Sequence, residues 1–145
     1  MKKLAIGLLA CLALLQVRAA EADWMTDLAK AQAKAKAENK MVFMDFTGSD
    51  WCPPCKALHS NVLTSKEFTD YAKDNLVLVV VDFPREKKQS AELKAANQAL
   101  SKRFNIEGYP TVIVLGPDGK QLKKDIGYSG QPASSFVADL KKLKK

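Results

Sequence analysis

Two cysteines separated by two prolines, Cys52 and Cys55, are the residues of this sequence best suited to chemistry. A cysteine attacks as its thiolate, and a helix start stabilises that anion through unbonded backbone N–H groups and the helix dipole. The sequence predicts such a start near Cys52, where Pro53 is tolerated because the first helical N–H groups lack partners. Pro54 fixes the turn. Cys55 then lies about one turn further along, close enough to attack a mixed disulfide formed at Cys52.

Other uses of a Cys-x-x-Cys pair stay open at this point. A closed zinc site needs four ligands, and His59 is the one further Cys or His after residue 22, so a carboxylate has to complete the set. Covalent haem attachment needs His directly after the second cysteine, where this chain has Lys56. A structural disulfide closing so small a loop constrains the unfolded chain little. A metal-binding carrier is thus a rival to a redox enzyme, and His59 alone reads as an exposed helix residue.

Residues 1–22 have the pattern of a secretory signal peptide. Two lysines precede an apolar run over residues 4–15, which is shorter than the roughly 20 residues of a transmembrane helix, and small residues follow. We expect cleavage between residues 19 and 22, which leaves a domain of residues 23–145 in the periplasm or outside the cell. Lipid attachment at Cys11 is disfavoured because the apolar run continues beyond it. If Cys11 is removed with the signal peptide, a redox-active role for the remaining pair is favoured over a structural disulfide.

Composition and charge point to one globular domain. The 145 residues are 47% hydrophobic, which is enough for one core without disulfide stapling. The net charge is +7, and part of the excess lies in four lysines at the C-terminal end, where a helix dipole favours them. Nucleic-acid binding needs a basic face with interleaved aromatic residues, which the pattern does not offer. Nucleic acid is therefore not an expected partner.

The elements that must position the cysteines follow from the hydrophobic pattern. An Ala- and Lys-rich stretch predicts a surface helix over residues 23–38, with Asp23 as its N-cap. Apolar runs predict strands at 41–46, 76–83 and 111–115, and a Pro-Asp-Gly turn leads to an antiparallel strand at 121–126. Further helices are expected at 52–63, 66–73 and 91–104, and from Pro132 to the tail. This order predicts an α/β fold, a mixed four-stranded sheet with helices on both faces.

Three elements of the sequence resemble the thioredoxin family: FMDF at 43–46, WCPPCK at 51–56 and GYPT at 108–111. The resemblance covers residues 41–143, and the three elements in this order are specific where a lone Cys-x-x-Cys is weak. More narrowly, FTGSDWC at 46–52 resembles secreted bacterial thioredoxin-like proteins, similar to the C-terminal domain of periplasmic thiol:disulfide interchange reductases. The chain differs in a longer polar stretch at 84–90 and in lacking the family's first strand, which the Ala/Lys helix replaces.

The resemblance implies a thioredoxin fold and a catalytic role for three residues. Cys52 corresponds to the attacking nucleophile and Cys55 to the resolving cysteine, and their redox-active disulfide needs no cofactor. Asp45 corresponds to the family's buried strand carboxylate, which helps to deprotonate the resolving thiol. Burial should raise the pKa of Asp45, which suits general acid/base catalysis near neutrality.

The resemblance implies substrate contacts for four more residues. Pro110 corresponds to a cis-proline that faces the cysteines and lets a substrate backbone pair with the neighbouring chain. Tyr109 precedes it and influences redox poise. Trp51 is expected to shield the site and contact substrate, and Gly127 to lie beside the substrate groove.

These implications predict a periplasmic or secreted protein-disulfide reductase. Its substrates are protein disulfides, its electron donor is a membrane-embedded reductase, and it acts as a monomer. The direction of exchange depends on the residues between the cysteines. Strongly oxidising relatives carry a histidine between the cysteines, which stabilises the thiolate, whereas this chain has Pro53 and Pro54. A reductase is therefore favoured. The alternatives are an oxidase or isomerase, or a thiol-based metal carrier.

Overall fold

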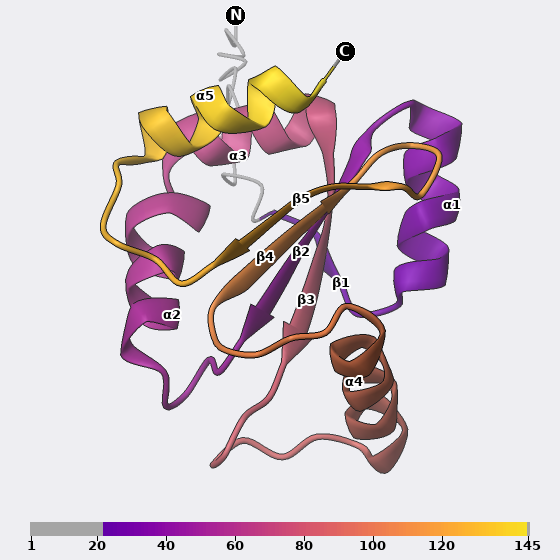
Figure 1. Ribbon diagram of the computed structural model, residues 1–145, viewed down its shortest axis with the longest axis vertical. Coiled ribbons are helices and arrows are strands. Elements are labelled where there is room, and N and C mark those ends of the chain that lie inside the picture. The colour runs from indigo at the N-terminus through magenta and orange to yellow at the C-terminus, as the bar shows by residue number, and fades with distance from the viewer. Residues whose placement is uncertain (1–21, 145) are drawn as a thin grey trace, which may run out of the picture.

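A mixed sheet of five strands forms the centre of the computed structural model, which describes residues 22–144 (Figure 1). The strands are β1 (Trp24–Met25), β2 (Met41–Thr47), β3 (Leu76–Asp82), β4 (Thr111–Leu115) and β5 (Gln121–Ile126). Their order across the sheet is β1-β3-β2-β4-β5, with β2 parallel to β3 and antiparallel to β4. Every residue of β2 is buried, as a strand covered on both faces requires. The predicted signal peptide, up to residue 21 and including Cys11, lies outside the described residues.

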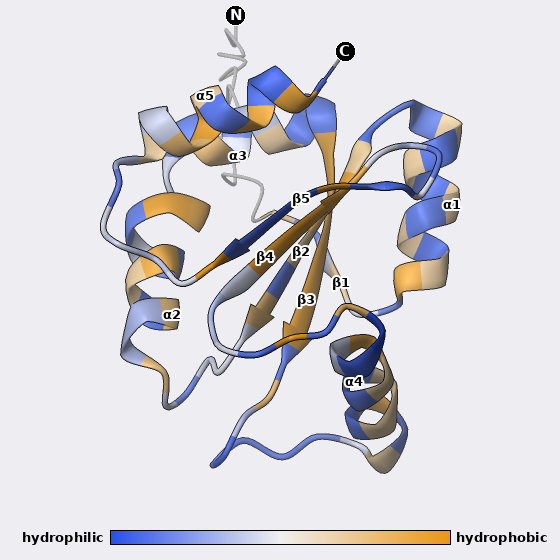
Figure 2. Cartoon of the chain, viewed as in Figure 1, coloured by the Kyte–Doolittle hydropathy of each residue, from blue (hydrophilic) through white to orange (hydrophobic). Residues whose placement is uncertain are grey.

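Helices cover both faces of this sheet (Figure 1). Helices α1 (Leu28–Glu38) and α4 (Ala91–Arg103) pack on one face, and α2 (Pro53–Leu58), α3 (Lys66–Asn75) and α5 (Ala133–Leu143) pack on the other. Figure 2 shows β3 and β4 as mainly hydrophobic, whereas the helices alternate between hydrophobic and hydrophilic residues. The predicted α/β class, with a mixed sheet and helices on both faces, is confirmed.

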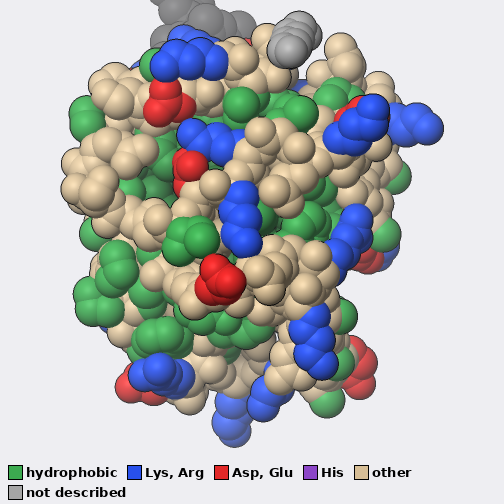
Figure 3. Space-filling view, in the orientation of Figure 1, with side chains coloured by type: hydrophobic (Ala, Val, Ile, Leu, Met, Phe, Trp, Pro, Cys, Tyr) green, Lys and Arg blue, Asp and Glu red, His purple; other side chains and the backbone are tan. Residues whose placement is uncertain are grey.

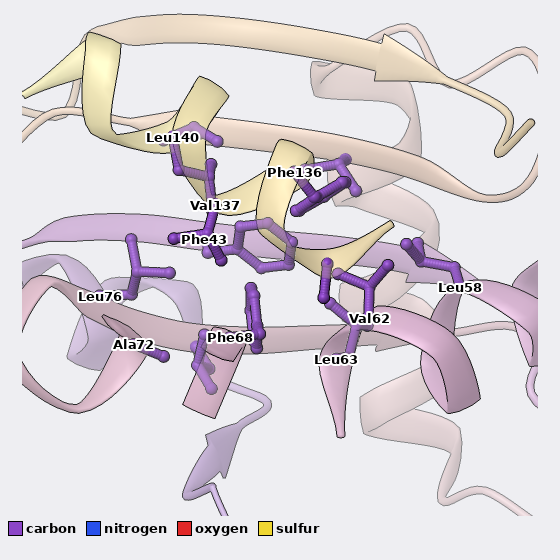
Figure 4. Close-up of a cluster of buried hydrophobic side chains, with 14 of the residues drawn as sticks. Phe43, Leu58, Val62, Leu63, Phe68, Ala72, Leu76, Phe136, Val137 and Leu140 are labelled. Atoms are coloured by element: carbon purple, nitrogen blue, oxygen red, sulfur yellow. The ribbon is translucent and has the colours of Figure 1, made fainter. Parts of the chain in front are cut away.

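Phe43 lies at the centre of the core between β2 and the helices α3 and α5 (Figure 4). Its ring is fully buried and meets Phe68 and Phe136 edge-on, at 5.3 and 6.1 Å between ring centroids. Edge-on aromatic pairs add to the stabilisation that burial provides. Because side chains alternate along a strand, Asp45 points to the same face of β2 as Phe43, the face that α2 covers.

The predicted start of the first helix and the strand count were wrong. Residues 24–25 form β1, which pairs parallel to β3 with Trp24 opposite Leu78, so the sheet has five strands and the family's first strand is present. Helix α1 begins at Leu28, after the N-cap Asp27, whose carboxylate accepts a hydrogen bond from the Lys30 N–H at 3.1 Å. Trp24 instead packs edge-on against Phe43, 6.2 Å between centroids. A two-residue strand has no periodicity, and the Ala- and Lys-rich composition favoured a longer helix.

The helix predicted over residues 52–63 is divided into α2 and a π-helical turn, η1 (His59–Leu63). Helix α3 starts separately after Ser65, whose hydroxyl accepts a hydrogen bond from the Phe68 N–H at 3.2 Å. Between residues 22 and 144, no helix is long and apolar enough to cross a membrane.

Candidate functional site

Cys52 and Cys55 form a disulfide at the start of α2, with their Cα atoms 5.3 Å apart. Strand β2 ends at Thr47, and the turn that follows is closed by a hydrogen bond from the Cys52 N–H to the Gly48 carbonyl at 2.9 Å. Cys52 is the N-cap of α2, with an extended backbone, so its side chain lies where the helix begins. Both cysteines are 3% exposed.

The two prolines reduce the number of backbone donors available at this helix start. Pro53 and Pro54 occupy the first two helical positions and carry no N–H, so Cys55 supplies the one N–H among the first three. The Cys55 sulfur itself accepts a hydrogen bond from the Gly48 N–H at 3.5 Å. A thiolate at Cys52 therefore receives less stabilisation here than at a helix start without prolines.

Asp45 is a buried carboxyl group in the cavity that Cys55 also lines. It lies on β2, is 6% exposed, and its Oδ1 has no hydrogen-bond partner. Asp45 and Cys55 line one cavity of about 380 Å³, together with Lys56 and His59. Burial, with a smaller contribution from the nearby charge of Asp82, raises the pKa of Asp45 to about 7. A carboxyl with this pKa exists in both protonation states near neutrality, which suits proton exchange with the neighbouring thiol.

His59, considered above as a third zinc ligand, is exposed and lines the same cavity. In the part of the chain that the structure describes, no group of three or more His, Cys, Asp or Glu side chains is arranged to hold a metal ion.

Four residues predicted to bind substrate form a continuous set of contacts. Trp51 and Tyr109 meet edge-on, 6.0 Å between ring centroids, and the Tyr109–Pro110 peptide bond is cis. The Gly127 N–H donates to the Pro110 carbonyl at 2.7 Å. Gly127 has a φ of +83°, in the left-handed region that glycine adopts without steric cost, and it is exposed. The structure thus brings these four residues together, and one of them, Trp51, directly precedes Cys52.

Gly48 and Phe83 fix the orientation of Trp51. A Cβ atom on Gly48 would lie 2.5 Å from Cε2 of the indole, so only glycine leaves room for the ring. The indole Nε1 donates to the Phe83 carbonyl at 2.8 Å, which joins the turn before Cys52 to the end of β3. The sequence motif predicted a role for Trp51, but it did not indicate that Gly48 and the Phe83 carbonyl contact its ring.

Sequence reasoning missed two further carboxylates, Asp50 and Asp82. The Asp82 carboxylate accepts hydrogen bonds from the N–H and the hydroxyl of Ser49, at 3.0 and 2.5 Å. The Asp50 carboxylate accepts from three consecutive backbone N–H groups, those of Arg85, Glu86 and Lys87. These bonds, led by that from the Arg85 N–H, lower the pKa of Asp50 to about 2. The one sequence signal was the Gly-Ser-Asp turn, which indicates where the strand ends but not what its side chains bind.

Comparison with known proteins gives a consistent result. Residues 28–144 match the family model described as a thioredoxin-like domain. The chain is 32% identical over 129 residues to the disulfide bond reductase DsbH of Chlamydia pneumoniae, covering 89% of this chain and 76% of that protein. It is 27% identical over 119 residues to the thiol:disulfide interchange protein DsbD of Pseudoalteromonas atlantica, covering 82% of this chain but 19% of that protein.

Solved structures show the same likeness. A structure of the DsbH oxidoreductase superposes with a TM-score of 0.78 at 32% identity, covering 90% of this chain and 91% of that one. The reduced C-terminal domain of DsbD from Neisseria meningitidis superposes with a TM-score of 0.60 at 26% identity, covering 80% and 93%. The predicted thioredoxin fold is therefore confirmed.

Proposed function

The chain belongs to the thioredoxin-like family, and on that premise we propose that it is a thiol–disulfide oxidoreductase that reduces protein disulfides in the periplasm or outside the cell. One observation carries the proposal: the Cys52–Cys55 disulfide lies at a helix start, and the buried Asp45 lines the same cavity as Cys55. The signal-peptide pattern of residues 1–22 supports the location.

The reaction follows from the two sulfurs and the carboxyl group. In the reduced protein, the Cys52 thiolate attacks one sulfur of a substrate disulfide, the substrate S–S bond breaks, and the released substrate thiolate takes up a proton. Asp45 then accepts the proton of the Cys55 thiol, and the Cys55 thiolate attacks the Cys52 sulfur. The mixed disulfide breaks, the second substrate sulfur leaves, and the Cys52–Cys55 disulfide forms. Two electrons have passed to the substrate, and the protein must be reduced again.

The direction of exchange is supported by the prolines. With no N–H at Pro53 or Pro54, the Cys52 thiolate is stabilised less, and a dithiol whose reduced form is stabilised less is a stronger reductant. The relative from Chlamydia pneumoniae is itself named a disulfide bond reductase. We propose a membrane-embedded dithiol protein as the electron donor, no cofactor beyond the disulfide, and a monomer as the working form.

The contacts of Trp51, Tyr109, Pro110 and Gly127 define the proposed substrate groove. Gly127 is bound to the Pro110 carbonyl, and Tyr109 packs on Trp51 beside Cys52. A substrate segment in extended conformation has free backbone groups of its own, which can pair with this part of the chain while its sulfur reaches Cys52.

The reduction potential of the pair tests the proposal. We would equilibrate the protein with glutathione and follow tryptophan fluorescence, since Trp51 adjoins Cys52. A potential near or below roughly −250 mV supports a reductase, whereas roughly −120 to −180 mV replaces it by an oxidase or isomerase. In parallel, Cys55→Ala should accumulate a mixed disulfide at Cys52 with a disulfide substrate, and Cys52→Ala should form none. Both variants keep one thiol, so the comparison separates the nucleophile from the resolving cysteine.

A further inference from the structure

The loop that follows β3, residues 83–90, is fastened to the turn that precedes Cys52. One carboxylate, that of Asp50, accepts hydrogen bonds from the N–H groups of Arg85, Glu86 and Lys87, at 3.0, 2.8 and 2.9 Å. Surface loops are usually the mobile parts of a fold. Three charge-assisted bonds to a single carboxylate instead fix the backbone at Arg85 relative to the cysteine pair.

The side chain of Arg85 is held as well as its backbone. Its guanidinium carbon lies 3.7 Å from the ring centroid of Trp51, the residue before Cys52. Tyr109 meets the same indole edge-on, so the ring is supported on a second side. A guanidinium stacked on an aromatic ring keeps its in-plane N–H donors available for another group.

Within the described part of the chain, no acidic side chain forms an ion pair with Arg85. Residues 22–144 contain six ion pairs, and none of them involves Arg85. Two carboxylates bonded to this part of the chain are already engaged, because Asp50 accepts from the loop N–H groups and Asp82 accepts from Ser49. The exposed acid of the loop, Glu86, forms none of these ion pairs either.

Two lysines extend the positive charge towards the disulfide. Lys56 and Lys87 line the cavity that contains Cys55, both are exposed, and neither takes part in those six ion pairs. Figure 3 shows basic side chains along the lower edge of the molecule, the end at which the loop after β3 lies in Figure 1. A negatively charged segment that approaches Cys52 therefore meets cations from the loop after β3 and from α2.

We propose that Arg85 binds a carboxylate of the substrate, on an Asp or Glu side chain next to the cysteine that Cys52 attacks. The planar guanidinium presents two parallel N–H groups, which match the two oxygens of a carboxylate. Because the loop and the stacked guanidinium are ordered before substrate arrives, little freedom is lost on binding. This inference rests on the proposed function and adds its substrate class, which is disulfides within acidic segments.

Matched disulfide peptides test this preference. The two peptides have the same length and differ in Glu or Gln on either side of the cysteine, and the reduced protein supplies the electrons. We expect the wild-type protein to react about tenfold faster with the Glu peptide, the effect of one charge-assisted hydrogen bond. The ratio should fall between roughly 0.05 and 1 M salt, because salt screens exposed charges.

Variants of two arginines distinguish a specific role of Arg85 from an effect of the protein's overall charge. Arg85→Gln should bring the ratio of the two rates to within about twofold, and Arg85→Lys should keep part of it, since the charge stays but the planar donors are lost. Arg103→Gln is the matched control, because Arg103 lies on α4 and contacts Phe104 rather than Trp51. It should leave the ratio unchanged.

Each outcome decides one claim. Equal rates with both peptides in the wild-type protein overturn the role of Arg85 and leave the proposed function intact. A ratio that falls as much in Arg103→Gln as in Arg85→Gln also overturns it, in favour of overall charge. Reduction of neither peptide overturns the proposed function itself.

Discussion

Replacement of Asp45 by Asn measures what the buried carboxylate costs the fold once it is charged. Burial, with a contribution from the charge of Asp82, raises the pKa of Asp45 from 3.8 to about 7. That difference corresponds to about 4 kcal/mol between the two protonation states. The folded protein holds the proton more tightly than the unfolded chain does. The stability that depends on protonated Asp45 is therefore fully present below about pH 4, and it is lost as the pH rises through about 7.

The Asp45→Asn variant should lose this pH dependence. Near pH 4 the free energy of unfolding of the oxidised variant should lie close to that of the oxidised wild-type protein, apart from a constant cost of burying the new amide. By about pH 8.5 the variant should have gained up to about 4 kcal/mol relative to wild type. Denaturant unfolding at several pH values, followed by tryptophan fluorescence on the oxidised proteins, gives this difference directly.

Asp50→Asn supplies a control of opposite sign. The N–H groups of Arg85 and its neighbours lower the pKa of Asp50 to about 2, so its charged form stabilises the fold above about pH 4. Asp50→Asn should therefore lose stability near neutrality, and the loss should shrink as the pH falls towards 2. If the difference between Asp45→Asn and wild type stays constant from about pH 4 to 8.5, the reasoning from burial is refuted.

Three further predictions concern the core, the turn and the helix start. Phe43→Ala should lower the free energy of unfolding by about 3–5 kcal/mol, measured by denaturant titration, because the ring is fully buried among aromatic partners. Gly48→Ala should cost about 1–3 kcal/mol and change the tryptophan emission, since its Cβ collides with Trp51; an unchanged spectrum would contradict this. Pro54→Ala restores a backbone N–H at the start of α2, so thiolate absorbance should show a lower pKa for Cys52. The reduction potential should rise for the same reason. An unchanged potential would show that the missing N–H groups do not set the stability of the Cys52 thiolate.

Local signals in the sequence were enough to predict four of the five strands and the helix start at Cys52. The strands at 111–115 and 121–126 were predicted with the bounds that β4 and β5 have, because a buried apolar run and a Pro-Asp-Gly turn define them without reference to the rest of the chain. The apolar run at 41–46 likewise predicted the strand that carries Asp45, which ends at Thr47. The break after that strand placed Cys52 at a helix start.

The contacts that hold the site depend on tertiary structure and were missed. Asp50 bonds to backbone groups 35 to 37 residues away, and the conformation of residues 83–90 decides whether these groups face it. A local pattern shows that stretch only as polar. β1 was missed for the same reason, because Trp24 gains its place from pairing with β3 and packing on Phe43 rather than from its neighbours in sequence.

The cost of Asp45 argues that its position serves chemistry. Three buried side-chain polar atoms lack a hydrogen-bond partner among residues 22–144, and they belong to Asp45, Tyr71 and Asn97. Asn97 still donates to the Asp82 carbonyl at 2.9 Å, and neither it nor Tyr71 lines the cavity that holds Cys55. Ionised carboxylates are seldom left buried without a partner, because water solvates them far better. At neutral pH the ionised Asp45 lowers the stability of the fold by several kcal/mol, in the cavity that Cys55 also lines. A group that weakens the fold there fits the proton transfer proposed above for Asp45.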